Sequence, residues 1–161
     1  MVGTQVTGKR LGIIGMGRVG QVPARRARGF EMEIHYSNRS RLADATEAGA
    51  TYHETIEDLL PHCDFLSIHC PATAETEGLL NADRIALLPH GAVVVNTARG
   101  PIIDDAALID ALRSGKLFAA GLDVYNNEPE SDPAYRDLDN VFLLPHGGSA
   151  TPAARDAMGF L

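Results

Sequence analysis

The feature that most constrains the fold is an apolar run that ends in three closely spaced glycines. Residues 10–20 read Arg-Leu-Gly-Ile-Ile-Gly-Met-Gly-Arg-Val-Gly, which places Gly15, Gly17 and Gly20 in the order G-x-G-x-x-G. Such a run followed by such a turn predicts a buried strand, a tight turn and the start of a helix. The segments that complete a βαβ unit are a strand at 9–14, a helix at 19–28 and a strand at 33–36.

Each glycine has its own steric role in a turn of this kind. Gly15 allows the tight turn, Gly17 allows a pyrophosphate to approach the backbone, and Gly20 allows the helix to pack close to the sheet. The helix N-terminus offers unpaired N–H groups and a partial positive charge to the phosphates, with Arg18 and Val19 as further candidate contacts. Three glycines alone also fit an ordinary turn, so the flanking βαβ unit is what favours nucleotide binding.

Pro23 falls inside the expected first helix, three residues after Gly20. Proline lacks a backbone N–H and clashes with the carbonyl four residues earlier, which costs up to ~3 kcal/mol in a helix interior. Two outcomes are open. Either the first turn of the helix bends or frays, or the preceding turn is loose enough to absorb the proline.

The remainder of the chain alternates between apolar strands and helical segments. Strands are expected at 65–68, 92–96, 119–123 and 141–144, with a short one near 49–52, and helices at 41–48, 55–60, 81–87 and 104–114. This alternation predicts an α/β fold, a Rossmann-type doubly wound parallel sheet in a single three-layer domain over 1–161.

Local signals refine this pattern. Thr55 and Asp58 have the spacing of an N-terminal capping box, and Pro61 is expected to end that helix. Residues 126–140, rich in Asp, Pro and Asn, are expected to form a long loop. The last residues, 158–161, are expected to lie within a helix.

Composition and charge exclude several classes of protein. The formal charge of −7 argues against nucleic-acid binding, which requires a clustered positive surface. The apolar runs are far shorter than the ~20 residues that cross a membrane, and residues 1–4 lack the features of a signal peptide. Cys63 and Cys70 are too few for a disulfide framework, so a cytoplasmic, reducing location is expected.

Five motifs occur in order between residues 12 and 151. They are Gly15-Met-Gly-Arg-Val-Gly20, His69-Cys-Pro-Ala-Thr-Ala-Glu-Thr76, Asn96-Thr-Ala-Arg-Gly-Pro-Ile-Ile-Asp104, Gly121-Leu-Asp-Val124 with Asn127-Glu-Pro129, and Leu144-Pro-His-Gly-Gly-Ser-Ala-Thr151. Together they resemble the D-isomer-specific 2-hydroxyacid dehydrogenases. The resemblance implies a two-lobed enzyme, of which residues 1–161 are the dinucleotide-binding lobe and the substrate lobe is absent.

The resemblance also implies a catalytic set for reducing a 2-oxo acid, which needs a hydride, a proton and a cation for the carboxylate. His146 matches the family's general acid and base, since imidazole titrates near neutral pH. Glu128 matches the carboxylate that pairs with this histidine, and Arg99 matches the guanidinium that binds the substrate carboxylate. Taken singly, each residue also fits a structural or solvated role.

Further cofactor contacts follow from the same resemblance. Asp123 matches the residue that contacts the nicotinamide amide, with a strand-capping aspartate as the alternative. Cys70 and Pro71 match the loop over the cofactor. Thr97 passes beside the nicotinamide ribose, and Gly148 belongs to the last motif.

The other cysteine and histidine residues give no metal signal. The spacing of Cys63, His69 and Cys70 fits no zinc pattern, so a metal site there is disfavoured. Four histidines are assigned to surface or structural roles: His35, His53, His62 and His90.

The end of the second strand bears on the choice of nicotinamide cofactor. NAD enzymes usually carry Asp or Glu there, which binds the adenosine ribose hydroxyls and repels a 2′-phosphate. Here Ser37 occupies the acidic position, and Asn38, Arg39 and Ser40 follow it. Because a cation and a hydroxyl suit a 2′-phosphate, NADP(H) is predicted over NAD(H), which stays the second choice.

Two alternatives to this cofactor prediction stay open. Arg39 and Arg41 would also be consistent with a solvated basic turn. Asp44 or Glu47 could supply the missing acid only if the loop folded back.

The resemblance thus implies an oxidoreductase that reduces a small 2-oxo acid, similar to glyoxylate or hydroxypyruvate, to the D-2-hydroxy acid. A chain without the substrate lobe is expected to be weakly active or inactive, and exposed apolar surface favours a homodimer. The alternative is a dinucleotide-binding or sensing module without turnover, because relatives of the family include dinucleotide-sensing corepressors. A relative of formate dehydrogenase is disfavoured by the turn at Asn38 and Arg39.

Overall fold

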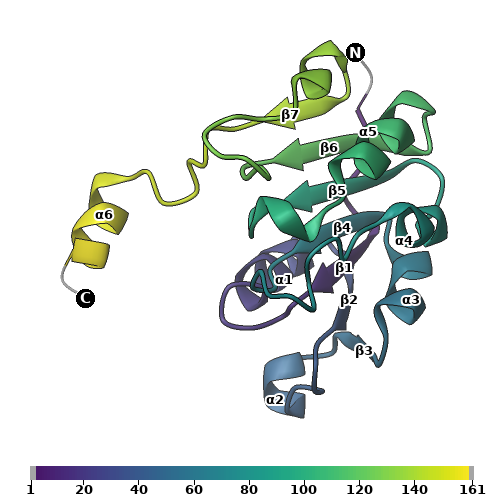
Figure 1. The fold of residues 1–161 in the computed structure, drawn as a ribbon. Coiled ribbons are helices and arrows are strands. Elements are labelled where there is room, and N and C mark those ends of the chain that lie inside the picture. The colour runs from purple at the N-terminus through teal and green to yellow at the C-terminus, as the bar shows by residue number, and fades with distance from the viewer. Residues whose placement is uncertain (1–2, 160–161) are drawn as a thin grey trace.

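A seven-stranded sheet forms the centre of the molecule in the computed structural model, which describes residues 3–159 (Figure 1). The strands are β1 (Arg10–Ile14), β2 (Glu33–Ser37), β3 (Thr51–His53), β4 (Phe65–Ile68), β5 (Ala92–Asn96), β6 (Leu117–Leu122) and β7 (Val141–Leu143). Their order is β3-β2-β1-β4-β5-β6-β7, and all neighbouring strands are parallel. The order reverses between β1 and β4, which is where doubly wound sheets bind ligands. The predicted Rossmann-type fold is confirmed.

Helices lie on both faces of this sheet and give it its three layers (Figure 1). The α-helices are α1 (Gln21–Arg28), α2 (Asp44–Glu47), α3 (Ile56–Leu59), α4 (Ala82–Leu87), α5 (Asp105–Arg113) and α6 (Pro152–Gly159), and the 3₁₀ turns are η1 (Leu60–His62), η2 (Gly100–Ile102) and η3 (Pro133–Asp137). α6 buries none of its residues and extends away from the sheet (Figure 1). The end of the predicted last helix, Phe160 and Leu161, lies outside the described residues.

Two apolar cores hold the layers together. The larger core includes Leu66 and Val94 of the sheet and Leu108 of α5. The smaller core joins Ile13 of β1 to Ala24 of α1. Within residues 3–159 no helix has the length and apolar character needed to span a membrane.

The turn before α1 absorbs Pro23, which is the second of the two expected outcomes. The helix begins at Gln21 rather than at Val19, so Pro23 is its third residue, where a backbone N–H has no partner within a helix. Val22 N–H bonds instead to the Val19 carbonyl at 3.0 Å. The proline is therefore tolerated in the first turn.

Other element boundaries differ from the sequence expectation in informative ways. The helix expected at 41–48 is only α2, because Arg41 turns back to bind Glu47 and the Leu42 N–H bonds to the Tyr36 hydroxyl. The loop expected at 126–140 contains η3, which is capped at its N-terminus by the Asp132 side chain, the acceptor of the Ala134 N–H.

Thr55 caps α3 as predicted, but the Asp58 carboxylate accepts the Thr55 hydroxyl, whereas in a capping box it accepts the backbone N–H of the capping residue. Asp58 N–H bonds to Thr55 Oγ1 at 3.0 Å, and the Thr55 hydroxyl donates to the Asp58 carboxylate at 2.6 Å. α3 ends at Leu59, just before Pro61 as predicted, and the chain continues from Leu60 as the 3₁₀ turn η1.

Three histidine rings stack where β2, β3 and η1 meet. His62 lies 5.2 Å from His35 and 5.0 Å from His53, measured between ring centroids. Nδ1 of His35 and Nε2 of His53 are 3.0 Å apart, so one neutral ring donates to the other. Burial lowers the pKa of His35 and of His53, and the neighbouring imidazoles lower both further.

This stack makes folding stability depend on pH. The unfolded chain protonates its histidines near pH 6.5, whereas the folded chain resists protonation until lower pH. We therefore expect the free energy of unfolding to be largest above about pH 6.5 and to fall as the solution is acidified. Urea titrations at several pH values measure this, and His53→Gln should flatten the profile while His90→Gln, at an exposed site, should not. Parallel profiles for His53→Gln and the parent would contradict the prediction.

Candidate functional site

The glycine-rich turn lies at the switch point between β1 and β4. Gly15 has a φ of 91°, and a Cβ there would lie 2.6 Å from the Cys70 backbone nitrogen, so both conformation and contact require glycine. A Cβ at Gly17 would meet nothing within 4 Å, which leaves that backbone open to a ligand. A Cβ at Gly20 would collide with the Gly15 carbonyl. Gly20 therefore allows the turn to close on itself, whereas the sequence predicted that it lets the helix pack close to the sheet.

The end of β2 holds the turn in place through two hydrogen bonds. Gly15 N–H donates to the Ser37 carbonyl at 3.0 Å, and Met16 N–H donates to Asn38 Oδ1 at 2.7 Å. Asn38, predicted as a cofactor contact, thus uses its side-chain oxygen to accept a hydrogen bond from the turn. Among residues 3–159 no protein group accepts a hydrogen bond from the Gly17, Arg18 or Val19 N–H. These donors suit a pyrophosphate.

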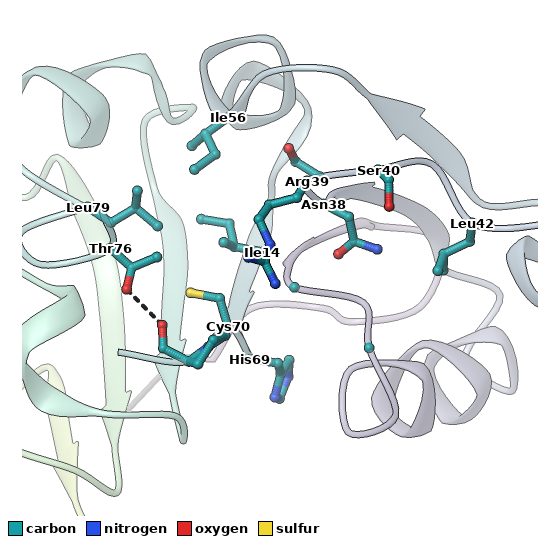
Figure 2. A pocket seen from close by; sticks show the side chains of 14 residues that line it. Ile14, Asn38, Arg39, Ser40, Leu42, Ile56, His69, Cys70, Thr76 and Leu79 are labelled. Carbon is teal, nitrogen blue, oxygen red and sulfur yellow. Dashed lines mark hydrogen bonds between the residues drawn. The ribbon is translucent and has the colours of Figure 1, made fainter. Parts of the chain in front are cut away.

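A first cavity of about 350 Å³ opens beside the turn (Figure 2). Eight of the predicted cofactor-binding residues line it: Gly15, Gly17, Ser37, Asn38, Arg39, Ser40, Cys70 and Pro71. Ile14, Ile56 and Leu79 add apolar walls, and Thr76 Oγ1 bonds to the Pro71 carbonyl at 2.7 Å, the dashed line in Figure 2. Apolar walls with a polar, basic rim fit an adenosine and its phosphates.

The two arginines near this cavity, Arg39 and Arg41, differ in their ion pairing. Arg41 is bound to Glu47 at 2.8 Å, and the same carboxylate accepts the Tyr36 hydroxyl at 2.6 Å, so Glu47 is buried and occupied. Arg39 is exposed and, in the described part of the chain, forms no ion pair. Its charge helps to lower the pKa of Glu75, after the hydrogen bond from Thr73. Arg41 is therefore held by an ion pair rather than being part of a solvated basic turn, and Glu47 is not free to supply the missing acid.

A second cavity, of about 720 Å³, shares Gly17, Cys70 and Pro71 with the first. It is also lined by Arg18 and Val19 of the turn and by Thr97 and Arg99 after β5. Gly148 lies beyond it, in a groove with Arg18, Val19 and Thr97. The shared residues make the two cavities a continuous path across the carboxyl ends of the strands, as a dinucleotide requires.

Asn96, to which the sequence assigned no role, shapes the turn that carries Arg99. Its side chain is 1% exposed, donates from Nδ2 to the Arg99 carbonyl at 2.9 Å and accepts the Ala98 N–H at 3.0 Å. Gly100 follows in contact with the Tyr125 backbone, where a Cβ would not fit. The sequence does contain a signal for this role, because a polar amide at the end of an otherwise apolar strand needs hydrogen-bond partners once it is buried.

His146 and Glu128 form a hydrogen-bonded pair, with 2.7 Å between Nδ1 and Oε2. The pKa of Glu128 is lowered chiefly by this bond, then by the Tyr125 N–H and also by the charge of Arg99. An ionised carboxylate only accepts, so Nδ1 carries the shared proton and Nε2 is the nitrogen left to exchange one. The three predicted catalytic residues thus lie close enough to interact electrostatically.

Asp123 holds the loop after His146. Its carboxylate is 4% exposed and accepts the Gly147 N–H at 2.6 Å and the Gly148 N–H at 2.9 Å. Asp123 and Gly20 line none of the cavities described above. The contact of Asp123 with a nicotinamide amide stays a prediction.

The two thiols occupy different environments. Cys63 lies beneath Gly12 in the core, where burial raises its pKa to about 12. Cys70 lines both cavities, and its pKa is raised by partial burial. Among the residues that the structure describes, no three His, Cys, Asp or Glu side chains are grouped so as to hold a metal ion.

Known proteins share both the sequence and this geometry. A glycerate dehydrogenase from Hyphomicrobium methylovorum is 44% identical over 160 residues, which are 98% of this chain and 50% of that protein. A D-isomer specific 2-hydroxyacid dehydrogenase structure from Polaromonas sp. JS6 66 superposes with a TM-score of 0.97 at 58% identity, over 99% of this chain and 50% of the other.

An NADPH-dependent glyoxylate/hydroxypyruvate reductase from Sinorhizobium meliloti, solved with NADP and malonate, gives a TM-score of 0.90 at 38% identity, over 95% of this chain and 47% of the other. The chain spans about half the length of these relatives. Residues 1–148 match the family described as "D-isomer specific 2-hydroxyacid dehydrogenase, NAD binding domain". The chain therefore belongs to the D-isomer specific 2-hydroxyacid dehydrogenases, as their NAD-binding domain.

Proposed function

We propose that this domain serves an NADP(H)-dependent enzyme that reduces a small 2-oxo acid, of the glyoxylate or hydroxypyruvate type, to the D-2-hydroxy acid. The observation that carries the proposal is the hydrogen bond between His146 Nδ1 and Glu128 Oε2, at 2.7 Å. The positive charge of Arg99 also lowers the pKa of the Glu128 carboxylate. The relatives named above, a glycerate dehydrogenase and a glyoxylate/hydroxypyruvate reductase, support this substrate class.

Each residue has a defined part in the reaction. The bound nicotinamide supplies the hydride for the 2-oxo carbon. Arg99 binds the substrate carboxylate and fixes its orientation, since a planar guanidinium matches a carboxylate. His146 donates a proton from Nε2 to the carbonyl oxygen, while Glu128 holds Nδ1 and stabilises the imidazolium. The remaining substrate contacts come from a second lobe.

NADP(H) is the preferred cofactor in this proposal. Ser37 removes the acid that would repel a 2′-phosphate, and Glu47 is occupied by Tyr36 and Arg41. Arg39 reaches into the first cavity (Figure 2), with Ser40 beside it. Gly17, Arg18 and Val19 bind the pyrophosphate, and Thr97, Asp123 and Gly148 lie on the nicotinamide side.

The proposal includes a homodimer and a cytoplasmic location. Both cysteines are free thiols, as a reducing compartment allows. Large apolar side chains lie exposed in the turn before α1 and on β7, with Val19 66% and Phe142 68% exposed.

Cofactor selection tests the role of Arg39. Titration calorimetry of the chain should give tighter binding of NADPH than of NADH, because a charge-assisted contact to the 2′-phosphate is lost with NADH. Arg39→Asp should weaken NADPH binding roughly 10- to 100-fold, the loss of a charged hydrogen bond, and should leave NADH binding less affected. Arg25→Asp, with the same charge change on α1, is the control. Equal losses for both cofactors would remove Arg39 from the phosphate site.

Turnover tests the role of His146. In a protein that carries both lobes, His146→Ala should lower kcat about 10²- to 10⁴-fold, the usual contribution of a general acid, with cofactor affinity nearly unchanged. His90→Ala at an exposed site is the matched control. Substantial residual turnover would show that another acid protonates the substrate.

Self-association tests the dimer. Light scattering at micromolar concentration should report dimers or larger species, because the exposed apolar side chains gain from being covered. Val19→Lys together with Phe142→Lys should shift the distribution to monomer. A monomer at every concentration of the parent chain would refute the homodimer.

A further inference from the structure

His146 has a left-handed backbone conformation. Its φ is 54°, in the left-handed region where residues with a Cβ are uncommon. The side chain is 45% exposed, so packing of the ring does not impose this conformation. Such a residue persists only where its neighbours fix the chain on both sides.

On the C-terminal side, Asp123 provides the anchor. Its buried carboxylate accepts the N–H groups of Gly147 and Gly148, the two residues that follow His146. These bonds fix where the chain leaves His146. Before His146, the Leu144 N–H donates to the Leu122 carbonyl at 2.8 Å, which leaves the Leu144 carbonyl to be held by another group.

On the N-terminal side, Tyr125 provides the anchor. Its hydroxyl donates to the Leu144 carbonyl at 2.6 Å, two residues before His146. Its backbone N–H donates to Glu128 Oε1 at 3.0 Å, on the carboxylate whose other oxygen meets His146. The ring packs against the larger core, which makes it a rigid support. Tyr125 is therefore bonded both to Glu128 and to the segment that carries His146.

We infer that Tyr125 is a positioning residue, whose hydroxyl sets His146 at hydrogen-bonding distance from Glu128. The inference rests on the proposed function, in which His146 is the acid. Without this hydroxyl, the Leu144 carbonyl loses its partner, and only the bond from the Leu144 N–H to the Leu122 carbonyl still holds the segment before His146. The ring of His146 then samples orientations that no longer meet the carboxylate.

Tyr125→Phe tests this inference, since it removes only the hydroxyl and keeps the ring and the bond from the backbone to Glu128. In the parent chain, long-range ¹H–¹⁵N spectra should show the His146 ring with its proton on Nδ1, because Glu128 accepts it. In Tyr125→Phe, we expect a mixture of the two tautomers and a rise in the pKa of the Glu128 carboxyl. Circular dichroism shows whether the variant is folded. Tyr125→Phe leaves the backbone carbonyl of Leu144 unaltered, so any change arises from the lost hydroxyl.

Tyr52→Phe is the matched control, because the Tyr52 hydroxyl bonds to the Asn38 carbonyl at 3.4 Å, far from His146 in the strand order. A folded Tyr125→Phe variant with an unchanged tautomer and an unchanged Glu128 pKa would overturn the inference. Because the spectra need no substrate, they are independent of turnover. If His146→Ala stays active while Tyr125→Phe shifts the tautomer, the proposed function fails and the positioning stands.

Discussion

The structure depends on one close approach, where the end of β1 meets the end of β4 without a side chain between them. Gly15 turns in a left-handed conformation against the backbone of His69 and Cys70. His69 N–H bonds to the Ile14 carbonyl at 2.8 Å, so the two strand ends are joined directly below the turn. A side chain at Gly15 would separate the strands at the point where the cavities meet.

The carboxyl ends of the other strands supply the residues that build the candidate site. β2 anchors the turn through Ser37 and Asn38, and β5 carries the turn of Arg99 through Asn96. Asp123 after β6 anchors the loop after β7 that carries His146. Parallel strands bring these ends to one edge of the sheet, so residues distant in the sequence become neighbours.

The sequence predicted most of the strands well because they are apolar runs between turn residues, and β4 and β5 match their expected bounds, whereas β2 and β3 carry several polar residues. It did not predict that Asn38 and Asp123 accept backbone N–H groups of neighbouring turns, and the contacts of both residues with the cofactor stay a prediction. Such bonds depend on which strand ends are adjacent and on the exact turn geometry, which periodicity does not contain. η3 was missed although Asp132 followed by Pro133 is a helix start signal.

The contrast between the two cysteines has a practical consequence for chemical labelling. Cys63 is fully enclosed, and its raised pKa keeps it a thiol, so it is inert to alkylating reagents. Cys70 lies on the wall that both cavities share. A thiol reagent small enough to enter would therefore modify one site, and the rate of that single reaction would report how much of the dinucleotide path is filled.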